Sequence, residues 1–176
     1  MTETLIRIPT LETERLRLRA AAPGDFEAYA AFRAEPRTQV LGGPHSRSDA
    51  FQMLAALVGQ WQLRGYGRWI IADRTDDRPL GVTGIFHPED WPEAELAWSL
   101  FGAAEGKGIA QEAALAARDF AYATLKLPPL ISMITAGNTR SEALARRLGA
   151  RIERDYQHPE FGDMRIWRHP SREDLA

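Results

Sequence analysis

The chain begins with residue-by-residue alternation of apolar and basic positions and then changes to a helical period. The alternation in "RLRLRAA", from Arg15, predicts a strand with Leu16 and Leu18 facing the core. The next segment, "PGDFEAYAAFRAEP", predicts a helix with Asp25 as its N-cap and Pro36 as its stop. Its apolar stripe consists of Phe26, Tyr29, Ala30 and Phe32.

A second helix is predicted from Ser48 to Arg64, and the glycines that follow it would end it. Its expected buried face consists of Phe51, Leu54, Ala55, Val58 and Trp61. Three predicted strands then follow in succession, in the segments "RWIIADR", "PLGVTGIF" and "AELAWSLF".

The second half of the chain predicts a helix, a buried strand, a shorter helix and a last pair of strands. The first helix covers about Ile109–Lys126 and ends before Pro128, and the buried strand is Leu130–Ala136. In "NTRSEALARRLG", Thr139 and Glu142 have the spacing of a capping box and would start the shorter helix. The segments "ARIERDY" and "MRIWRH" predict the last strands, with "QHPEFGD" between them.

The predicted order of elements is β-α-α-β-β-β-α-β-α-β-β, which lacks the regular alternation of a doubly wound fold. Consecutive strands in the middle indicate an antiparallel meander, and the later strand-helix-strand indicates one parallel crossover. We therefore predict a mixed α+β fold, in which about four helices flank a central, mostly antiparallel sheet of about six to seven strands.

Composition narrows the class of protein. A hydrophobic share of 44% and a charged share of 26% in 176 residues are typical of one soluble globular domain. The absence of cysteine excludes disulfides and thiolate chemistry, and the 4 histidines lack the spacing of a metal site, so we expect no metal. With a net charge of −2 and a pI of about 6.1, the chain is not expected to bind nucleic acid through bulk charge.

Targeting signals are not apparent in the sequence. No apolar run approaches the roughly 20 residues of a membrane span. The first residues also lack the charged start and apolar run of a signal peptide. We therefore expect a cytoplasmic protein that does not bind membranes.

The stretch "EGKGIAQEA", Glu105–Ala113, places two glycines at the start of a predicted helix. It is not a P-loop, because Lys107 is followed by Gly108 rather than by a hydroxyl residue. It does not fit a dinucleotide-binding fingerprint either, because Gln111 stands at the third glycine. Two interpretations remain: a plain strand-to-helix turn, or a turn whose backbone N–H groups bind a pyrophosphate at the helix N-terminus.

Four segments in the same order resemble the GNAT acyltransferases, in particular the branch that acetylates ribosomal-protein N-termini and small amines. These segments are "LETERLRLR", "AELAWSLF", "EGKGIAQEA" and "NTRSEALARRLGA". The resemblance runs from about Leu11 to Pro170, so it implies a single GNAT N-acetyltransferase domain at 11–170 with terminal extensions 1–10 and 171–176. It also implies acetyl-CoA as the co-substrate and an amine as the acceptor, and it suggests a homodimer.

The family's loop pattern, Gln/Arg-x-x-Gly-x-Gly/Ala, falls on Glu105–Ala110. The resemblance implies that the coenzyme pyrophosphate binds to the backbone N–H groups of Gly106, Lys107, Gly108, Ile109 and Ala110. Glu105 departs from the pattern at its first position, and we expect its side chain to point to solvent or its backbone alone to contribute.

The resemblance implies further contacts with the coenzyme. Asn138 would contact the pantetheine arm, and Ser141, one helical turn later, would lie near the sulfur. The strand residues Ser99, Leu100 and Phe101 would offer backbone hydrogen bonds to the pantetheine amides. A structural role is the alternative for Asn138 and Ser141, because both residue types suit the start of a helix.

Glu95 and Ser141 are the predicted catalytic residues. Glu95 would accept the proton of the amine through a water, and a strand-edge salt bridge is its alternative role. His87 and the acidic residues beside it are the other candidate bases. Many family members use a tyrosine on the short helix to protonate the sulfur, but Ala145 occupies that position, so Ser141 is the best substitute donor.

The leading hypothesis is an N-acetyltransferase that transfers the acetyl group of acetyl-CoA to a primary amine by direct attack in a ternary complex. The acceptor would be a protein N-terminal α-amine or a small-molecule amine. The alternatives are an acetyl-CoA-binding sensor of the same fold and a nucleotide-binding protein that uses the same loop. The 4 carboxylates in "HPEDWPEAE" suggest a cationic acceptor.

Overall fold

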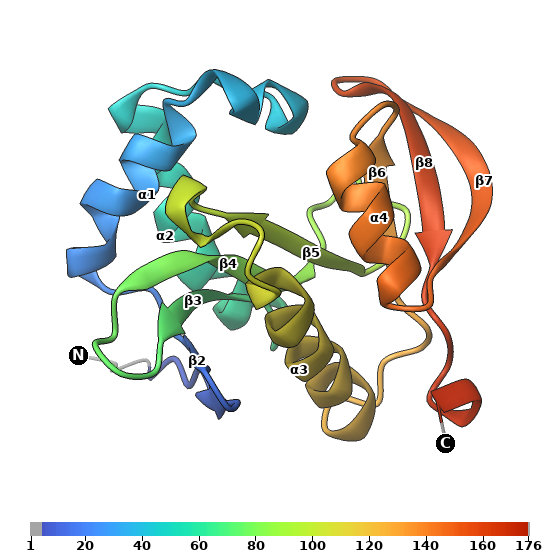
Figure 1. Cartoon of the computed structure of the whole chain (residues 1–176), viewed down its shortest axis with the longest axis horizontal. Helices are drawn as coiled ribbons and strands as arrows, with labels where there is room; N and C mark the ends of the chain where they lie inside the picture. Colours follow the sequence, from blue (N-terminus) through green and yellow to red (C-terminus); the bar gives the residue numbers. More distant parts are fainter. Residues whose placement is uncertain (1–4, 176) are drawn as a thin grey trace.

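Eight strands form a single sheet between two groups of helices in a computed structural model that describes residues 5–175 (Figure 1). The strands are β1 (Leu11–Glu12), β2 (Leu16–Arg19), β3 (Arg68–Asp73), β4 (Pro79–Phe86), β5 (Glu95–Leu100), β6 (Ile131–Thr135), β7 (Arg151–His158) and β8 (Gly162–Arg168). The α-helices are α1 (Phe26–Arg33), α2 (Arg47–Arg64), α3 (Ile109–Ala123) and α4 (Thr139–Arg147). Short 3₁₀ helices are η1 (Pro23–Asp25), η2 (Pro36–Leu41), η3 (Gly102–Ala104) and η4 (Glu173–Leu175). The predicted terminal extensions include residues 1–4 and 176, which lie outside the described residues.

The sheet has the strand order β1-β2-β3-β4-β5-β6-β8-β7 and is antiparallel except between β5 and β6. The helix α3 connects these two parallel strands, so the predicted crossover is confirmed. The mixed α+β fold with four flanking α-helices is also confirmed for the described residues. The sheet has eight strands there, rather than six to seven, because the two-residue β1 pairs with β2 at the edge.

The strands β5 and β6 are paired at one end only. Their parallel register consists of the pair Glu95 and Ile131, at the start of both strands. Beyond this pair the strands diverge toward their C-terminal ends (Figure 1). The loop that follows β5 and the helix that follows β6 therefore face each other across the divergence, where Arg140 reaches Glu105.

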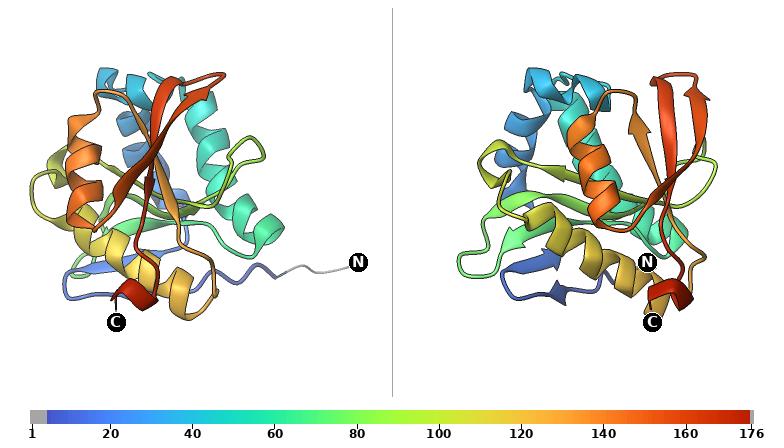
Figure 2. Two further views of the ribbon diagram at one scale, coloured as in Figure 1. Left: turned by 90° about the vertical axis from the view of Figure 1, so that its right-hand side faces the viewer. Right: turned by 45° about the vertical axis from the view of Figure 1, so that its right-hand side comes forward.

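Figure 2 shows α1 and α2 on one side of the sheet and α3 and α4 on the other. The core on the first side includes Tyr29, Phe32, Leu57, Ile70 and Val82. On the second side, α3 packs against the sheet through small side chains, which are Ala113, Ala114, Ala117 and Ala121. This helix ends at Ala123, slightly before the predicted end at Lys126.

The buried face of α2 differs from the predicted one. It consists of Ala50, Leu54, Leu57 and Trp61. Phe51, which was expected on that face, is 60% exposed. No charged residue stands between Asp49 and Arg64, so the sequence pattern does not define one polar side of the helix. Packing against α1 and β3 therefore determined the rotation of α2.

The helix α4 begins differently from the prediction. Its N-cap is Asn138, whose Oδ1 accepts a hydrogen bond of 3.3 Å from a backbone N–H of the first turn. The predicted capping box of Thr139 and Glu142 is wrong. The Glu142 carboxylate instead accepts hydrogen bonds of 3.4 Å from Arg146, one turn later on α4, and from Arg165 on β8.

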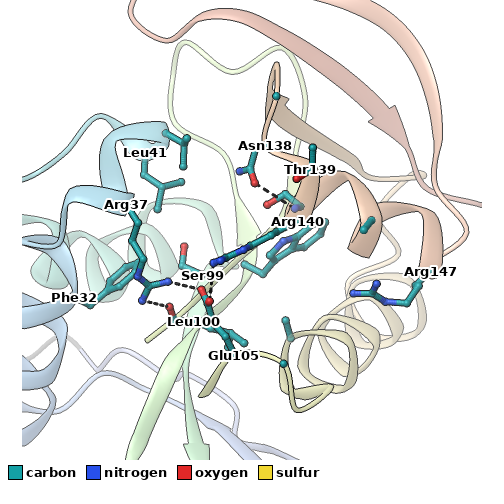
Figure 3. A pocket seen from close by; sticks show the side chains of 17 residues that line it. Phe32, Arg37, Leu41, Ser99, Leu100, Glu105, Asn138, Thr139, Arg140 and Arg147 are labelled. Carbon is teal, nitrogen blue, oxygen red and sulfur yellow. Dashed lines mark hydrogen bonds and ion pairs between the residues drawn. The ribbon is translucent and has the colours of Figure 1, made fainter. Parts of the chain in front are cut away.

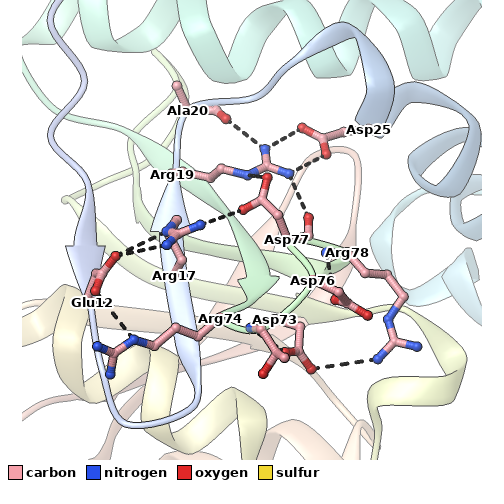
Figure 4. A network of polar contacts seen from close by, with 11 residues as sticks. Glu12, Arg17, Arg19, Ala20, Asp25, Asp73, Arg74, Asp76, Asp77 and Arg78 are labelled. Atoms are coloured by element: carbon pink, nitrogen blue, oxygen red, sulfur yellow. Dashed lines mark hydrogen bonds and ion pairs between the residues drawn. The ribbon is translucent and has the colours of Figure 1, made fainter.

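Asp25 is the N-cap residue of α1, as predicted, but its side chain makes no capping hydrogen bond to that helix. Its two oxygens instead accept hydrogen bonds of 2.8 Å from the Arg19 guanidinium group on β2, and Arg19 Nε lies 2.9 Å from Asp77. Figure 4 shows this network, which connects β2 to the turn between β3 and β4.

Candidate functional site

A cavity of about 790 Å³ opens where β5 and β6 diverge, and Figure 3 shows the side chains that converge on it. Its lining comes from four segments, which contribute Phe32, Arg37, Val40 and Leu41, then Trp98, Ser99 and Leu100, then Glu105, Gly106 and Ala110, and finally Gly137, Asn138, Thr139, Arg140, Ser141, Ala143 and Arg147. Three arginines and one glutamate give the lining a formal charge of +2. Such a surface favours an anionic ligand.

Six of the predicted coenzyme-binding residues line this cavity, namely Ser99, Leu100, Gly106, Ala110, Asn138 and Ser141. The remaining four, Phe101, Lys107, Gly108 and Ile109, are not part of the lining. The Phe101 side chain is buried between α1 and the sheet, and its N–H donates to Leu80 O at 2.8 Å. The Lys107 amine turns back to Ala103 O at 2.8 Å, and Ile109 is buried in the core.

The loop before α3 has a backbone form that glycine permits. Gly106 and Gly108 have φ angles of 75° and 76°, in the left-handed region where other residues are strained. Within residues 5–175, the N–H groups of Ile109, Ala110 and Gln111 donate to no protein acceptor, because they form the first turn of α3. These N–H groups and the positive end of the helix dipole can bind an anion.

Arg15 holds this loop in place, a role that sequence reasoning did not detect. Its Nη1 donates to Lys107 O at 2.9 Å, and its Nε donates to Glu112 at 2.7 Å. Glu112 also accepts hydrogen bonds from the Arg15 backbone N–H and from Thr13. Arg15 and Glu112 lie 97 positions apart in the chain, so no local pattern indicates their contact.

On the opposite wall, α4 presents Asn138 and Ser141 to the cavity. The structural role of Asn138 as N-cap is confirmed, and its amide group still faces the cavity (Figure 3). The Ser141 backbone N–H donates to Asn138, whereas no side-chain hydrogen bond of Ser141 occurs in the described part of the chain. The Ser141 hydroxyl is therefore free to donate to a group bound in the cavity.

Glu105 does not point to solvent, so that prediction is wrong. Its carboxylate accepts one hydrogen bond from Arg37 and another, of 2.8 Å, from Arg140. Figure 3 shows the two arginines approaching it from opposite walls. Arg37 and Arg140 lie 68 and 35 positions away in the chain, and only the fold brings them to this carboxylate.

Glu95 occupies the first position of β5 and is 7% exposed, but it does not line the cavity. Trp91 Nε1 donates to its Oε2 at 2.6 Å, and Met133 N–H donates to its Oε1 at 3.0 Å. Burial raises the pKa of Glu95 to about 7, although these hydrogen bonds and the charge of Arg68 act in the opposite direction. Glu95 is thus a buried carboxyl group that exchanges its proton near neutral pH.

The other candidate bases also lie outside the lining. His87 Nδ1 lies 2.8 Å from the Tyr66 hydroxyl, and burial lowers the pKa of this histidine. Glu89 pairs with Arg64 at 2.9 Å, and Asp90 lies beside a buried histidine. The carboxylates of "HPEDWPEAE" are therefore dispersed, and they do not form a cation-binding surface in the cavity.

The position that carries a tyrosine in many GNAT enzymes is closed to the cavity in this chain. Ala145 is fully buried, in a cluster with Ile134, Ala150 and Trp167. Ser141, one turn earlier on α4, is in the lining. A hydroxyl donor on this helix is therefore available from Ser141 and not from position 145.

Residues 5–175 hold neither a metal-binding cluster nor a membrane-spanning helix. These residues contain no group of three or more histidine or acidic side chains positioned to hold a metal ion. None of their helices combines the length and the apolar character needed to cross a bilayer.

Comparison with known proteins gives consistent matches along nearly the whole chain. Residues 15–151 match the model of the acetyltransferase (GNAT) domain. The structure of an acetyltransferase from Agrobacterium tumefaciens is 36% identical, with a TM-score of 0.86 over 97% of this chain and 99% of that one. The ribosomal-protein-S5-alanine acetyltransferase from Vibrio fischeri is 16% identical, with a TM-score of 0.72 over 95% and 99% of the two chains. RimL, a ribosomal alpha-N-protein acetyltransferase in complex with coenzyme A, is 18% identical, with a TM-score of 0.69 over 92% and 97%.

Proposed function

This chain belongs to the GNAT acetyltransferase family, and on that premise we propose that it transfers the acetyl group of acetyl-CoA to a primary amine. The acceptor is a protein N-terminal α-amine or a small-molecule amine, and it attacks the thioester directly in a ternary complex. The observation that carries this proposal is the cavity between β5 and α4, with the N-terminus of α3 at one end. We assign the activity to one domain at residues 11–170.

The residues of the cavity fit the chemistry of coenzyme A. The pyrophosphate would bind at Gly106 and Ala110, where the N–H groups of the first turn of α3 have no protein acceptor. Lys107 and Gly108 then shape this loop from behind the lining, and Ile109 contributes its backbone N–H while its side chain is buried. The three arginines of the lining supply positive charge for the phosphates.

The pantetheine arm would extend between β5 and α4. Leu100 offers it backbone groups from one wall, and Asn138 offers its amide from the other. The Ser99 backbone faces its β4 partner Val82, so Ser99 only lines this wall. The Phe101 N–H is bonded to Leu80 O, so we leave Phe101 out of these contacts. The thioester would then lie near Ser141, whose hydroxyl is free to donate.

In the transfer itself, the amine nitrogen bonds to the acetyl carbon, the carbon–sulfur bond breaks and the amine loses a proton. An α-amine with a pKa of about 7.7–8.0 is already partly neutral at pH 7, so it needs little help from a base. The departing sulfur, whose thiol has a pKa of about 8.5, needs a hydrogen-bond donor more than a strong acid, and we assign that role to Ser141. Glu95 remains our candidate for the base. It would act through a water, because its pKa of about 7 suits proton exchange at neutral pH.

The test is a thiol-release assay with acetyl-CoA and a panel of small amines and peptides with free N-termini. We expect release of coenzyme A with at least one acceptor, together with heat on titration of acetyl-CoA into the protein. Binding of acetyl-CoA without turnover on any amine would indicate a sensor, a reading that the buried Ala145 favours. Heat with ATP or NAD but not with acetyl-CoA would contradict the proposal.

A further inference from the structure

One carboxylate joins three segments across the cavity. Glu105 lies in the loop after η3, Arg37 lies in η2, and Arg140 lies in the first turn of α4. Arg140 Nη1 donates to Glu105 at 2.8 Å, and Arg37 Nη1 donates to the other oxygen of the same carboxylate. Both ion pairs are partly open to water, with side-chain exposures of 34% for Glu105, 32% for Arg37 and 78% for Arg140. The bridge is therefore accessible to a competing anion.

Glu105 is the single carboxylate in the lining, and it neutralises part of the charge that surrounds it. The third arginine of the lining, Arg147, forms no ion pair in the described part of the chain. Without Glu105, the formal charge of the lining would rise from +2 to +3. The residue at this position thus lowers the attraction of the cavity for a polyanion.

Arg37 is held by more than Glu105. Its Nη2 donates to Leu100 O at 3.0 Å, and its guanidinium carbon lies 5.1 Å from the centre of the Phe32 ring. Glu35 accepts a further hydrogen bond from its Nε. Leu100 O is one of the strand groups that we assign to the pantetheine arm, so Arg37 occupies an acceptor that the coenzyme would use.

We propose that Glu105 competes with coenzyme A for Arg37 and Arg140, and that binding of the coenzyme replaces this carboxylate by phosphate oxygens as the partner of both arginines. This inference rests on the proposed function. The loop itself has no cation at position 105. Arg37 and Arg140 supply the cationic contact for the phosphates from the flanking walls instead. Glu105 keeps their guanidinium groups over the cavity. It also lowers the affinity for coenzyme A below the affinity that the same arginines would give without this carboxylate.

The test is isothermal titration of coenzyme A into the full chain and into five variants. These are Glu105→Gln, Arg140→Gln, the double variant of these two, Arg147→Gln, and Arg147→Gln combined with Glu105→Gln. Glu105→Gln keeps the size of the side chain and removes the charge, so we expect it to bind about three- to fivefold more tightly. Arg140→Gln should bind about fivefold more weakly, because it removes a phosphate partner. In the double variant the gain from Glu105→Gln should fall below about twofold, because the two residues are coupled.

Arg147→Gln is the matched control, since it removes a lining arginine that is not bonded to Glu105. Its loss of affinity should be unchanged when it is combined with Glu105→Gln. If Glu105 only stabilised the loop, Glu105→Gln would weaken binding. If the wild type binds coenzyme A but Glu105→Gln binds it equally or more weakly, this inference is overturned and the proposed function is not. No binding of coenzyme A by the wild type would overturn the proposed function and this inference with it.

Discussion

The Trp91 indole donates a hydrogen bond of 2.6 Å to Glu95 Oε2, and this bond lies where the glutamate is almost withdrawn from water. Two donated hydrogen bonds do not offset the cost of burying the charge, because the pKa of Glu95 still rises to about 7. The protonation of this group therefore links the stability of the protein to pH near neutrality.

The first prediction concerns stability. The pKa of Glu95 rises from 4.5 to about 7 on folding, so the folded state holds a proton that the unfolded state has lost. The contribution to stability is complete below pH 4.5 and disappears as the pH rises through about 7. Its full size is on the order of 3 kcal/mol. Glu95→Gln should make the free energy of unfolding, measured with urea at pH 5, 6, 7 and 8, less dependent on pH. Parallel profiles for wild type and variant would contradict the assignment.

The same carboxyl group gives a kinetic prediction. If Glu95 is the base, kcat/KM of the wild type rises with pH and levels off above about 7. Glu95→Gln should remove this step, so its loss of rate is greatest above pH 7. Glu89→Gln is the control, since that side chain is 99% exposed and pairs with Arg64. A step that persists in Glu95→Gln would point to the acceptor amine as the titrating group.

A third prediction concerns Gly108, whose φ of 76° is in the left-handed region and whose added Cβ would lie 3.5 Å from Arg15 Nη2. Gly108→Glu should cost about 1–2 kcal/mol of stability through backbone strain. It should also abolish binding of coenzyme A, because it places a negative side chain in the loop before α3, where we propose that the pyrophosphate binds. Gly65→Glu is the matched control. It has a similar φ of 74°, with no atom within 4 Å of the added Cβ, and it ends α2. Calorimetric titration should detect binding in the control only.

Arg15 should act on coenzyme binding without touching the coenzyme. Arg15→Ala removes the bonds to Lys107 O and Glu112, so the loop before α3 loses its support. We expect KM for acetyl-CoA to rise about tenfold, with kcat changed less than about twofold, because ordering the loop becomes part of the cost of binding. Arg47→Ala removes an exposed arginine that pairs with Glu27, away from this loop, and should leave both constants unchanged. An equal fall of kcat in Arg15→Ala would contradict a positioning role.

Ser141→Ala should lower kcat about fivefold to tenfold without changing KM for acetyl-CoA. This loss of rate corresponds to the contribution of one hydrogen bond to the departing sulfur in the transition state. The neighbouring Thr139→Ala also removes a hydroxyl from the lining and should leave kcat unchanged. Stopped-flow measurement of thiol release separates this effect from product release. An unchanged rate in Ser141→Ala would contradict the assignment of Ser141 on α4 as the hydrogen-bond donor to the sulfur.

Much of the site could be located from the sequence, because its chemistry resides in the backbone of short contiguous segments. Gly106 and Gly108 are evident as glycines before a helix, and the strand before them could be read from its pattern. Side-chain partners were predicted less well. Glu105 was expected in solvent and Glu142 in a capping box, yet both bind arginines that other elements supply.

The sequence by itself determined the order of the elements, the single parallel crossover and the glycine loop between β5 and α3. These features depend on local periodicity and on the conformations that glycine and proline allow, so they are encoded within a few neighbouring residues. Only the tertiary structure decided which face of α2 is buried, how far Glu95 is withdrawn from water, and which arginines meet Glu105. Each of these depends on contacts between residues distant in the chain, and the energies of burial and ion pairing are set by those contacts.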